Sequence, residues 1–290
     1  MPKVFAELYR RDKALTLTGW LHVALLAVML AAAFYDTRTI LGINPWIKPM
    51  KFASSIAIYV WTLAWFLDYV AGPNWAKRLI SYVTSLGMVV EIVCISLQSI
   101  RGTTSHFNIH TAFDSAIYIA MGVFIGINML LATLFLLLLF LKPEVSPPAY
   151  LWSVRFGVFI TILAGIEGTI MITHFGHSVG RDETGPEPIV PTIEEVDGRL
   201  VNTANILRDG DPGLAIVNFS TEGGDLRIAH GWGLHALQVI PFFGFLVSRR
   251  RNQFSDRTAM TLVLGFTALY TAVGTFLFYQ AVQGYPLIPS

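Results

Sequence analysis

Seven long apolar runs constrain this chain more than any other feature of its sequence. They span roughly 15–35, 52–71, 78–99, 115–141, 150–175, 229–248 and 258–282. Each run is long enough to cross a bilayer core about 30 Å thick. In lipid every peptide group must find its hydrogen bond within the segment, so each run is expected to be a helix. The sequence therefore predicts an all-α, polytopic integral membrane bundle of about seven transmembrane helices.

The composition agrees with this class of protein. Of the 290 residues, 54% are hydrophobic and 13% are charged, and the mean hydropathy is +0.58. A soluble domain usually carries about 25% charged residues. The net charge of +1 creates no field that would recruit nucleic acid, so no nucleic-acid partner is expected. We expect residues 1–290 to form a single transmembrane domain.

Lys and Arg placement predicts the orientation of the bundle. One set of connections holds Lys3, Arg10, Arg11, Lys13, Lys77, Arg78, Lys142, Arg249, Arg250, Arg251 and Arg257. Short cytoplasmic loops carry the excess of positive charge, which predicts N-terminus in and C-terminus out. Residues 178–225 are too polar to enter lipid and become a long extracytoplasmic loop or lid, with a small hairpin flanking the DG of VDGRLV. Nothing indicates a eukaryotic source, so we expect a bacterial inner membrane, with the active face extracytoplasmic.

Histidines form the main functional signal. Six of the seven come in three pairs: His106 and His110, His174 and His177, His230 and His235. Alternating helix directions put all three pairs at the outer end of the bundle, and this shared depth favours a metal or haem site over unrelated packing contacts. If the fourth helix begins early enough, His106, His110 and Asp114 form one stripe, because residues four apart share a helical face. All seven of these residues are predicted metal ligands.

The third pair differs from the others in its spacing. His230 and His235 are five residues apart, about 140° around a helix, so they cannot point the same way. We favour His235 as the ligand, because Gln238 shares its face. His230 is then a supporting residue, or it lies in a non-helical entry capped by Asp225. The lone His22 is interpreted as a hydrogen-bonded packing residue.

Two carboxylates lie inside apolar runs and are the predicted catalytic groups. Glu91 and Glu167 each sit at membrane depth, where a charge costs about 3 kcal/mol on insertion scales and needs a partner or a function. Further polar side chains expected near the same end are predicted substrate-binding residues: Trp46, Lys48, Gln98, Arg101 and Gln238. Trp46 and Lys48 also suit a simple interfacial anchor.

Imidazoles and carboxylates at one end of a bundle suit a transition metal. The leading hypothesis is an oxidoreductase with a dinuclear iron or copper site that acts on a lipid-like or quinone-like substrate. The alternatives are a b-type haem protein, a zinc-dependent lipid or amide hydrolase, a metal transporter or sensor, and a polar network that only joins helices. The histidine pairs resemble those of membrane desaturases in pattern only, because the HxxHH box is absent.

A transporter needs polar groups that continue from the outer end of the bundle toward its inner end. Below Glu91 and Glu167 the sequence offers mainly Asp68 and His22, with apolar residues between them. This pattern favours a one-sided site, with membrane lipid and a lipophilic substrate or quinone as its partners.

Overall fold

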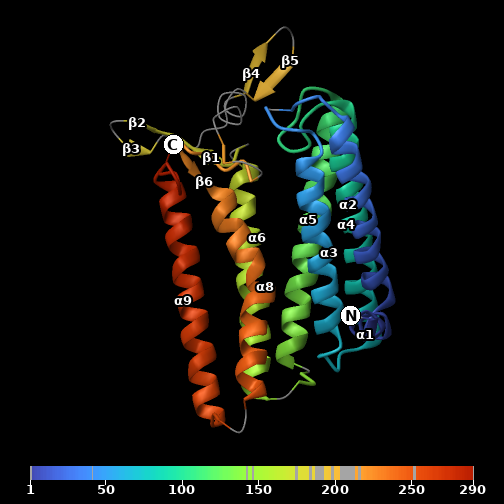
Figure 1. The fold of residues 1–290 in the computed structure, drawn as a ribbon, viewed down its shortest axis with the longest axis vertical. Coiled ribbons are helices and arrows are strands. Elements are labelled where there is room, and N and C mark those ends of the chain that lie inside the picture. The colour runs from blue at the N-terminus through green and yellow to red at the C-terminus, as the bar shows by residue number, and fades with distance from the viewer. Residues whose placement is uncertain are drawn as a thin grey trace. The chain divides into compact units, whose positions relative to one another are not determined.

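The computed structural model describes residues 2–40, 42–141, 143–145, 147–173, 176–182, 185–186, 193–196, 199–202, 213–214, 217–250 and 253–289. The helices of this part are α1 (Pro2–Arg11), α2 (Lys13–Tyr35), α3 (Ile47–Leu67), α4 (Asn74–Arg101), α5 (Ala112–Leu141), α6 (Pro148–Thr173), α8 (Leu226–Arg249) and α9 (Asp256–Val282). Seven of these described helices, all but α1, are long and apolar enough to cross a membrane (Figure 1). The predicted fold class is confirmed, while the orientation stays a prediction.

Most helices extend a few residues beyond their apolar runs. The clearest difference is α3, which begins at Ile47, five residues before its apolar run at 52–71. Pro49 lies in the first turn of α3. Backbone N–H groups there have no acceptor within the helix, so a proline breaks no helical hydrogen bond. Side-chain caps fix other starts: Asp12 accepts from the Leu15 amide at the start of α2, and Ser255 accepts from the Thr258 amide before α9.

Contacts within the structure group the chain into two compact units, which are described separately. The prediction of a single domain stays a prediction. Unit 1 comprises Met1–His106 and Phe113–Ser146 and holds α1 to α5. In it α2 packs against α3 and α4, and α3 packs against α4. The amphipathic α1 joins them through the Phe5 ring, which lies 4.7 Å from Trp20 and 5.2 Å from Trp61.

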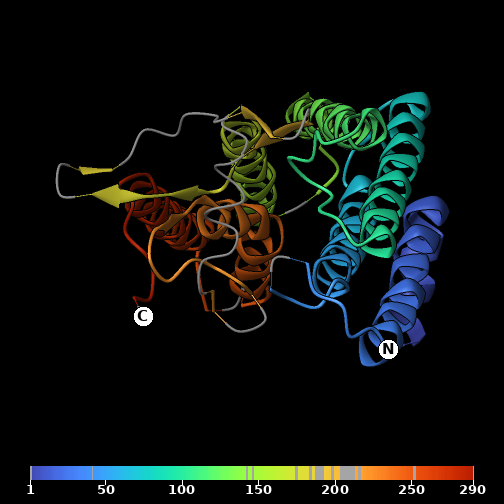
Figure 2. The same cartoon turned by 90° about the horizontal axis from the view of Figure 1, so that it is seen from above.

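Unit 2 comprises Phe107–Ala112 and Pro147–Ser290. Its helices α6 and α8 lie side by side, and α9 packs on both (Figures 1 and 2). The strands form three antiparallel pairs: β1 (Ser178–Val179) with β6 (Gly224–Asp225), β2 (Arg181–Asp182) with β3 (Gly185–Pro186), and β4 (Ile193–Val196) with β5 (Arg199–Asn202). The last pair confirms the hairpin predicted on either side of the DG.

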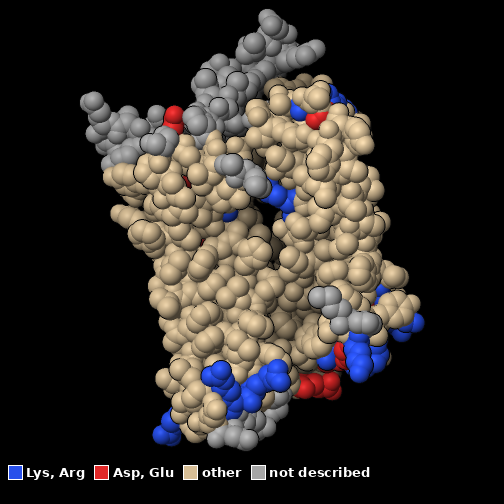
Figure 3. Space-filling view, viewed as in Figure 1, with Lys and Arg blue, Asp and Glu red and all other residues tan. Residues whose placement is uncertain are grey.

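Close backbone approach joins α6 to α8. A Cβ on Gly157 would lie 2.9 Å from the Ala236 carbonyl oxygen, and a Cβ on Gly233 would overlap Ala164. Small residues of this kind let membrane helices pack closely, where there is little hydrophobic drive for association. Charged side chains visible in Figure 3 gather toward helix ends, while uncharged atoms cover most of the visible helix surface between them.

Candidate functional site

One end of unit 1 carries a hydrogen-bonded cluster of polar side chains, formed by Gln98, Arg101 and Asp114. Asp114 lies in the first turn of α5 and is 3% exposed. Its Oδ1 accepts hydrogen bonds from Gln98 at 2.8 Å and from Arg101 at 2.5 Å. The Arg101 guanidinium also lies 4.7 Å from the centre of the Phe113 ring. Asp114 therefore joins α4 to α5 through an ion pair, and Gln98 and Arg101 are part of the same contact.

A second group of polar side chains in unit 1 surrounds Glu91, which lies about two turns of α4 from Gln98. Glu91 is 2% exposed, and its Oε2 has no hydrogen-bond partner within the described residues. Its Oε1 lies 4.0 Å from Nε2 of His106, whose ring stands 5.6 Å from Phe52. The Lys48 ammonium, in the first turn of α3, interacts electrostatically with the same carboxyl group. We call Glu91, His106 and Lys48 the Glu91 cluster.

The predicted substrate residue Trp46 lies in the connection between α2 and α3. Its indole N–H donates to Asp36 Oδ2 at 2.9 Å. Arg38 donates to both oxygens of the same carboxylate, and these hydrogen bonds hold the pKa of Asp36 well below its usual range. Trp46 therefore helps to fix this connection, and its roles as an interfacial anchor or substrate residue stay predictions.

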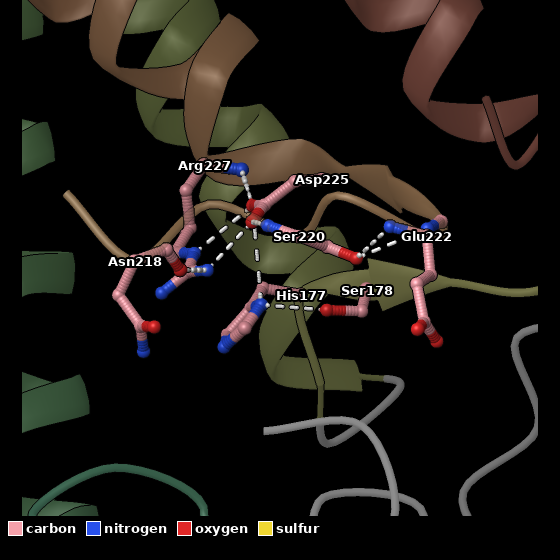
Figure 4. Close-up of polar contacts among 8 residues, drawn as sticks. His177, Ser178, Asn218, Ser220, Glu222, Asp225 and Arg227 are labelled. Atoms are coloured by element: carbon pink, nitrogen blue, oxygen red, sulfur yellow. Dashed lines mark hydrogen bonds and ion pairs between the residues drawn. The ribbon is translucent and has the colours of Figure 1, made fainter. Parts of the chain in front are cut away.

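In unit 2 the pairing of β1 with β6 brings His177 to Asp225 (Figure 4). Asp225 caps α8 by accepting from the Arg227 amide at 3.0 Å, and it accepts from the Ser220 amide at 3.0 Å and from the Arg227 guanidinium at 2.6 Å. His177 Nδ1 lies 3.1 Å from the Ser178 hydroxyl and 3.9 Å from Asp225. Burial raises the pKa of Asp225, but the hydrogen bonds and charge of Arg227 outweigh it, so the net shift is downward.

The third histidine pair divides between two environments. His230 lies inside α8 and its Nδ1 is 2.7 Å from the carbonyl oxygen of Ala164 on α6. His235 is exposed on α8, and Gln238 is half-buried. The expected cap by Asp225 is confirmed, whereas the expected non-helical entry around His230 is wrong because α8 begins at Leu226. On α6, Oε2 of Glu167 has no hydrogen-bond partner within the described residues.

The expected stripe of His106, His110 and Asp114 is wrong, because α5 begins only at Ala112. His106 belongs to unit 1 and His110 to unit 2, where its amide donates to the Asn108 side chain at 3.2 Å. His174 lies outside the described residues. Among the residues that are described, no three His, Cys, Asp or Glu side chains form a group that could hold a metal ion.

Sequence reasoning missed polar contacts on the other side of Glu91. Ser81 donates to Asp12 at 2.8 Å, and Thr84 and Tyr59 each donate to Asn128, at 3.2 and 3.1 Å. His22 is fully buried between α2 and α4. The expectation of mainly apolar residues below Glu91 is therefore wrong in unit 1. The available signal was the spacing of Ser81, Thr84, Glu91 and Gln98, which places them on one face of α4.

Comparisons of the chain with models of protein families, with characterised proteins and with solved structures found no match. The helices define the class, an integral membrane protein. The geometry of each unit indicates which functions are possible.

Proposed function

We propose that the protein is a proton-coupled integral membrane protein and that the Glu91 cluster is its proton-exchanging site. The observation that carries the proposal is the Glu91 carboxyl group itself, which is 2% exposed in a membrane-spanning helix and has one oxygen without a hydrogen-bond partner among the described residues. An ionisable group at this depth is costly, and such groups are usually functional.

The surroundings of Glu91 give the carboxyl group two stable forms. As an anion it is balanced by Lys48, and by His106 when that imidazole is protonated. As a neutral acid it needs no counter-charge, and its unpartnered oxygen can carry the proton. His106 follows the end of α4 and is 27% exposed, so we expect it to connect the buried carboxyl group with the aqueous phase. A proton can therefore pass between water, the imidazole and the carboxyl group.

Infrared difference spectroscopy of the purified protein in lipid nanodiscs tests this function. A change of pH should produce a carboxylic-acid band that disappears in Glu91→Gln. Glu167→Gln is the matched control, because it removes a membrane carboxyl group from unit 2 and should leave the Glu91 band in place. His106→Phe should slow the exchange without removing the band. If no band depends on Glu91 between weakly acidic and alkaline pH, the proposal is refuted.

A second candidate function is oxidoreduction with a histidine-ligated metal or haem in unit 2, acting on a lipophilic or quinone-like substrate. The observation that favours it is the orientation of His230, whose Nδ1 contacts the Ala164 carbonyl oxygen at 2.7 Å. Ligating histidines usually donate their second ring N–H in this way, which leaves Nε2 for the metal. Gly168 lies beside the ring, since a Cβ there would be 3.0 Å from Cε1 of His230.

Optical spectra and elemental analysis of the gently purified protein test the second candidate. A Soret band would indicate haem, and stoichiometric iron, copper or zinc without that band would indicate a non-haem site. His230→Leu should lose the bound group, while the exposed His235→Leu should retain it. A protein with neither absorbance nor metal would exclude this candidate and leave the proton-exchange proposal in place.

A further inference from the structure

We propose that the buried face of α4 forms a proton path through unit 1, from Asp12 at one end to Arg101 at the other. The inference rests on the proposed role of Glu91 and extends it, because a path makes proton movement across the membrane an activity of the protein. The juxtaposition that suggests it is a row of polar contacts on one helix face, continued on both sides of Glu91.

The row runs along nearly all of α4. Its members recur three or four residues apart, as required for one helical face, and all are buried: Ser81, Thr84, Met88, Glu91, Ile95 and Gln98. From Ser81 to Gln98 the helix rises about 26 Å, close to the thickness of a bilayer core. Four of the six side chains are polar, and a fifth position, Met88, contributes its backbone carbonyl group to a contact with His22.

The half of the row between Asp12 and Met88 is lined by hydroxyl and amide groups. Ser81 donates to Asp12, the residue that caps α2. Farther along, Thr84 of α4 and Tyr59 of α3 both donate to the side-chain oxygen of Asn128 on α5. Hydroxyl groups both donate and accept, so Ser81, Thr84 and Tyr59 can each relay a proton, while the Asn128 oxygen only accepts and holds two of these hydroxyl groups in place.

His22 is the strongest single observation. Its ring is 0% exposed, Nδ1 lies 2.7 Å from the Thr18 carbonyl oxygen, and Nε2 lies 3.2 Å from the Met88 carbonyl oxygen. A carbonyl oxygen only accepts, and a neutral imidazole has one N–H. Both contacts are hydrogen bonds only when the ring carries two protons. The neutral ring leaves one nitrogen lone pair facing a carbonyl oxygen, whereas a protonated ring would donate to both carbonyl oxygens.

Glu91 follows one turn later and provides the next proton acceptor. Met88 and Glu91 are three residues apart, about 4.5 Å along the helix axis. In the transfer step an N–H bond of the His22 imidazolium breaks and an O–H bond forms on the Glu91 carboxylate, which leaves a neutral imidazole and a neutral acid. The proposed transfer requires bridging water wherever a gap is longer than a hydrogen bond.

The remaining charged groups of unit 1 on this route lie toward Arg101. Lys48 of α3 and His106 border Glu91, and Gln98, Arg101 and Asp114 form the ion-paired cluster at the end. The neutral Glu91 acid gives its proton to His106, and the imidazolium releases it to water. One proton enters at one end and one leaves at the other, so no electron donor or acceptor is required. In the alternative case, the polar contacts only hold the helices together. They would have the same geometry but would not conduct protons.

Proton flux into proteoliposomes separates these two cases. Vesicles loaded with a pH-sensitive dye and potassium receive valinomycin, and the resulting potential drives proton entry. Wild-type protein should raise the entry rate above that of protein-free vesicles. His22→Phe should reduce the added rate at least about tenfold, which corresponds to about 1.4 kcal/mol on the transfer barrier. His235→Phe removes an exposed histidine of α8 and should conduct like wild type.

Thr84→Val keeps the shape of the side chain and removes only its hydroxyl group, so it tests the path even if His22→Phe fails to fold. It should also lower the flux, while thermal melting stays near that of wild type. Absence of flux in wild-type vesicles, or flux that neither variant reduces, overturns the path. The infrared band of Glu91 is measured on the same proteins, so a path that fails while the band persists leaves the proposed function standing.

Discussion

Asp225→Asn tests the most heavily bonded carboxylate of unit 2. The substitution keeps the side-chain shape and one oxygen acceptor for the cap of α8, but it removes the negative charge. The Asp225 side chain is 0% exposed and that of its partner Arg227 is 28% exposed. The variant therefore leaves a partly buried guanidinium without its counter-charge.

The expected loss follows from these exposures. Breaking a buried ion pair by removing one partner costs about 3–5 kcal/mol, and the partial exposure of Arg227 places this pair near about 3 kcal/mol. Asp225→Ala also removes the helix cap, which adds about 1 kcal/mol. Replacing both partners, Asp225→Asn with Arg227→Met, should recover part of the loss because no unpaired charge remains.

Unfolding in mixed detergent micelles, followed by tryptophan fluorescence, measures these differences. Asp256→Asn is the matched control, because this exposed residue lies in the first turn of α9 and its substitution should change stability by less than about 0.5 kcal/mol. An Asp225→Asn variant as stable as the control would show that the carboxylate does not hold the start of α8 as described.

The same pair predicts a dependence on pH. The folded-state pKa of Asp225 lies below its usual range, so the unfolded chain binds the proton first as the pH falls. The stabilisation is fully present above about pH 4, near the unfolded pKa, and is lost as the pH falls through the lower folded value. The stability difference between wild type and Asp225→Asn should therefore shrink in strong acid, and a difference that grew there would contradict the sign.

Three further substitutions test other contacts. Gly224→Ala should destabilise unit 2 by about 1–3 kcal/mol, because a Cβ there meets the backbone carbonyl of Ala281. At Gly122 an added Cβ would lie more than 4 Å from every described atom outside the neighbouring backbone of α5. Gly122→Ala should therefore be neutral or stabilise α5 by up to about 1 kcal/mol, as melting of both variants would show. Asp114→Asn should cost about 2–3 kcal/mol by unpairing Arg101, and chemical unfolding at neutral pH measures the loss.

The fold was largely predictable because backbone groups in lipid must form their hydrogen bonds within the protein, which permits few structures. An apolar run of about 20 residues must be a helix, whatever it packs against. Helix ends were harder to predict, since they depend on caps and polar flanks. Pro49, for example, lies in the first turn of α3, which begins five residues before the apolar run 52–71.

The candidate site was less predictable because the sequence predicts how deep a residue lies in the bundle but not which neighbour its side chain meets. His230 and His235 share a depth, yet one contacts α6 and the other is exposed. His106 and His110 precede α5, where helical spacing does not apply. The proposed role of His22 depends on two carbonyl groups, from Thr18 and Met88, and backbone acceptors of this kind leave no mark in a sequence.

The glycine contacts between α6 and α8 fix how the two helices align along their length. Gly157 fits against Ala236, Gly233 against Ala164, and Gly244 against Ser153, in one antiparallel register. A slip of either helix would push a larger side chain into a neighbouring backbone. Two halves of the chain, synthesised separately and divided between these helices, should therefore find each other in the membrane and reassemble.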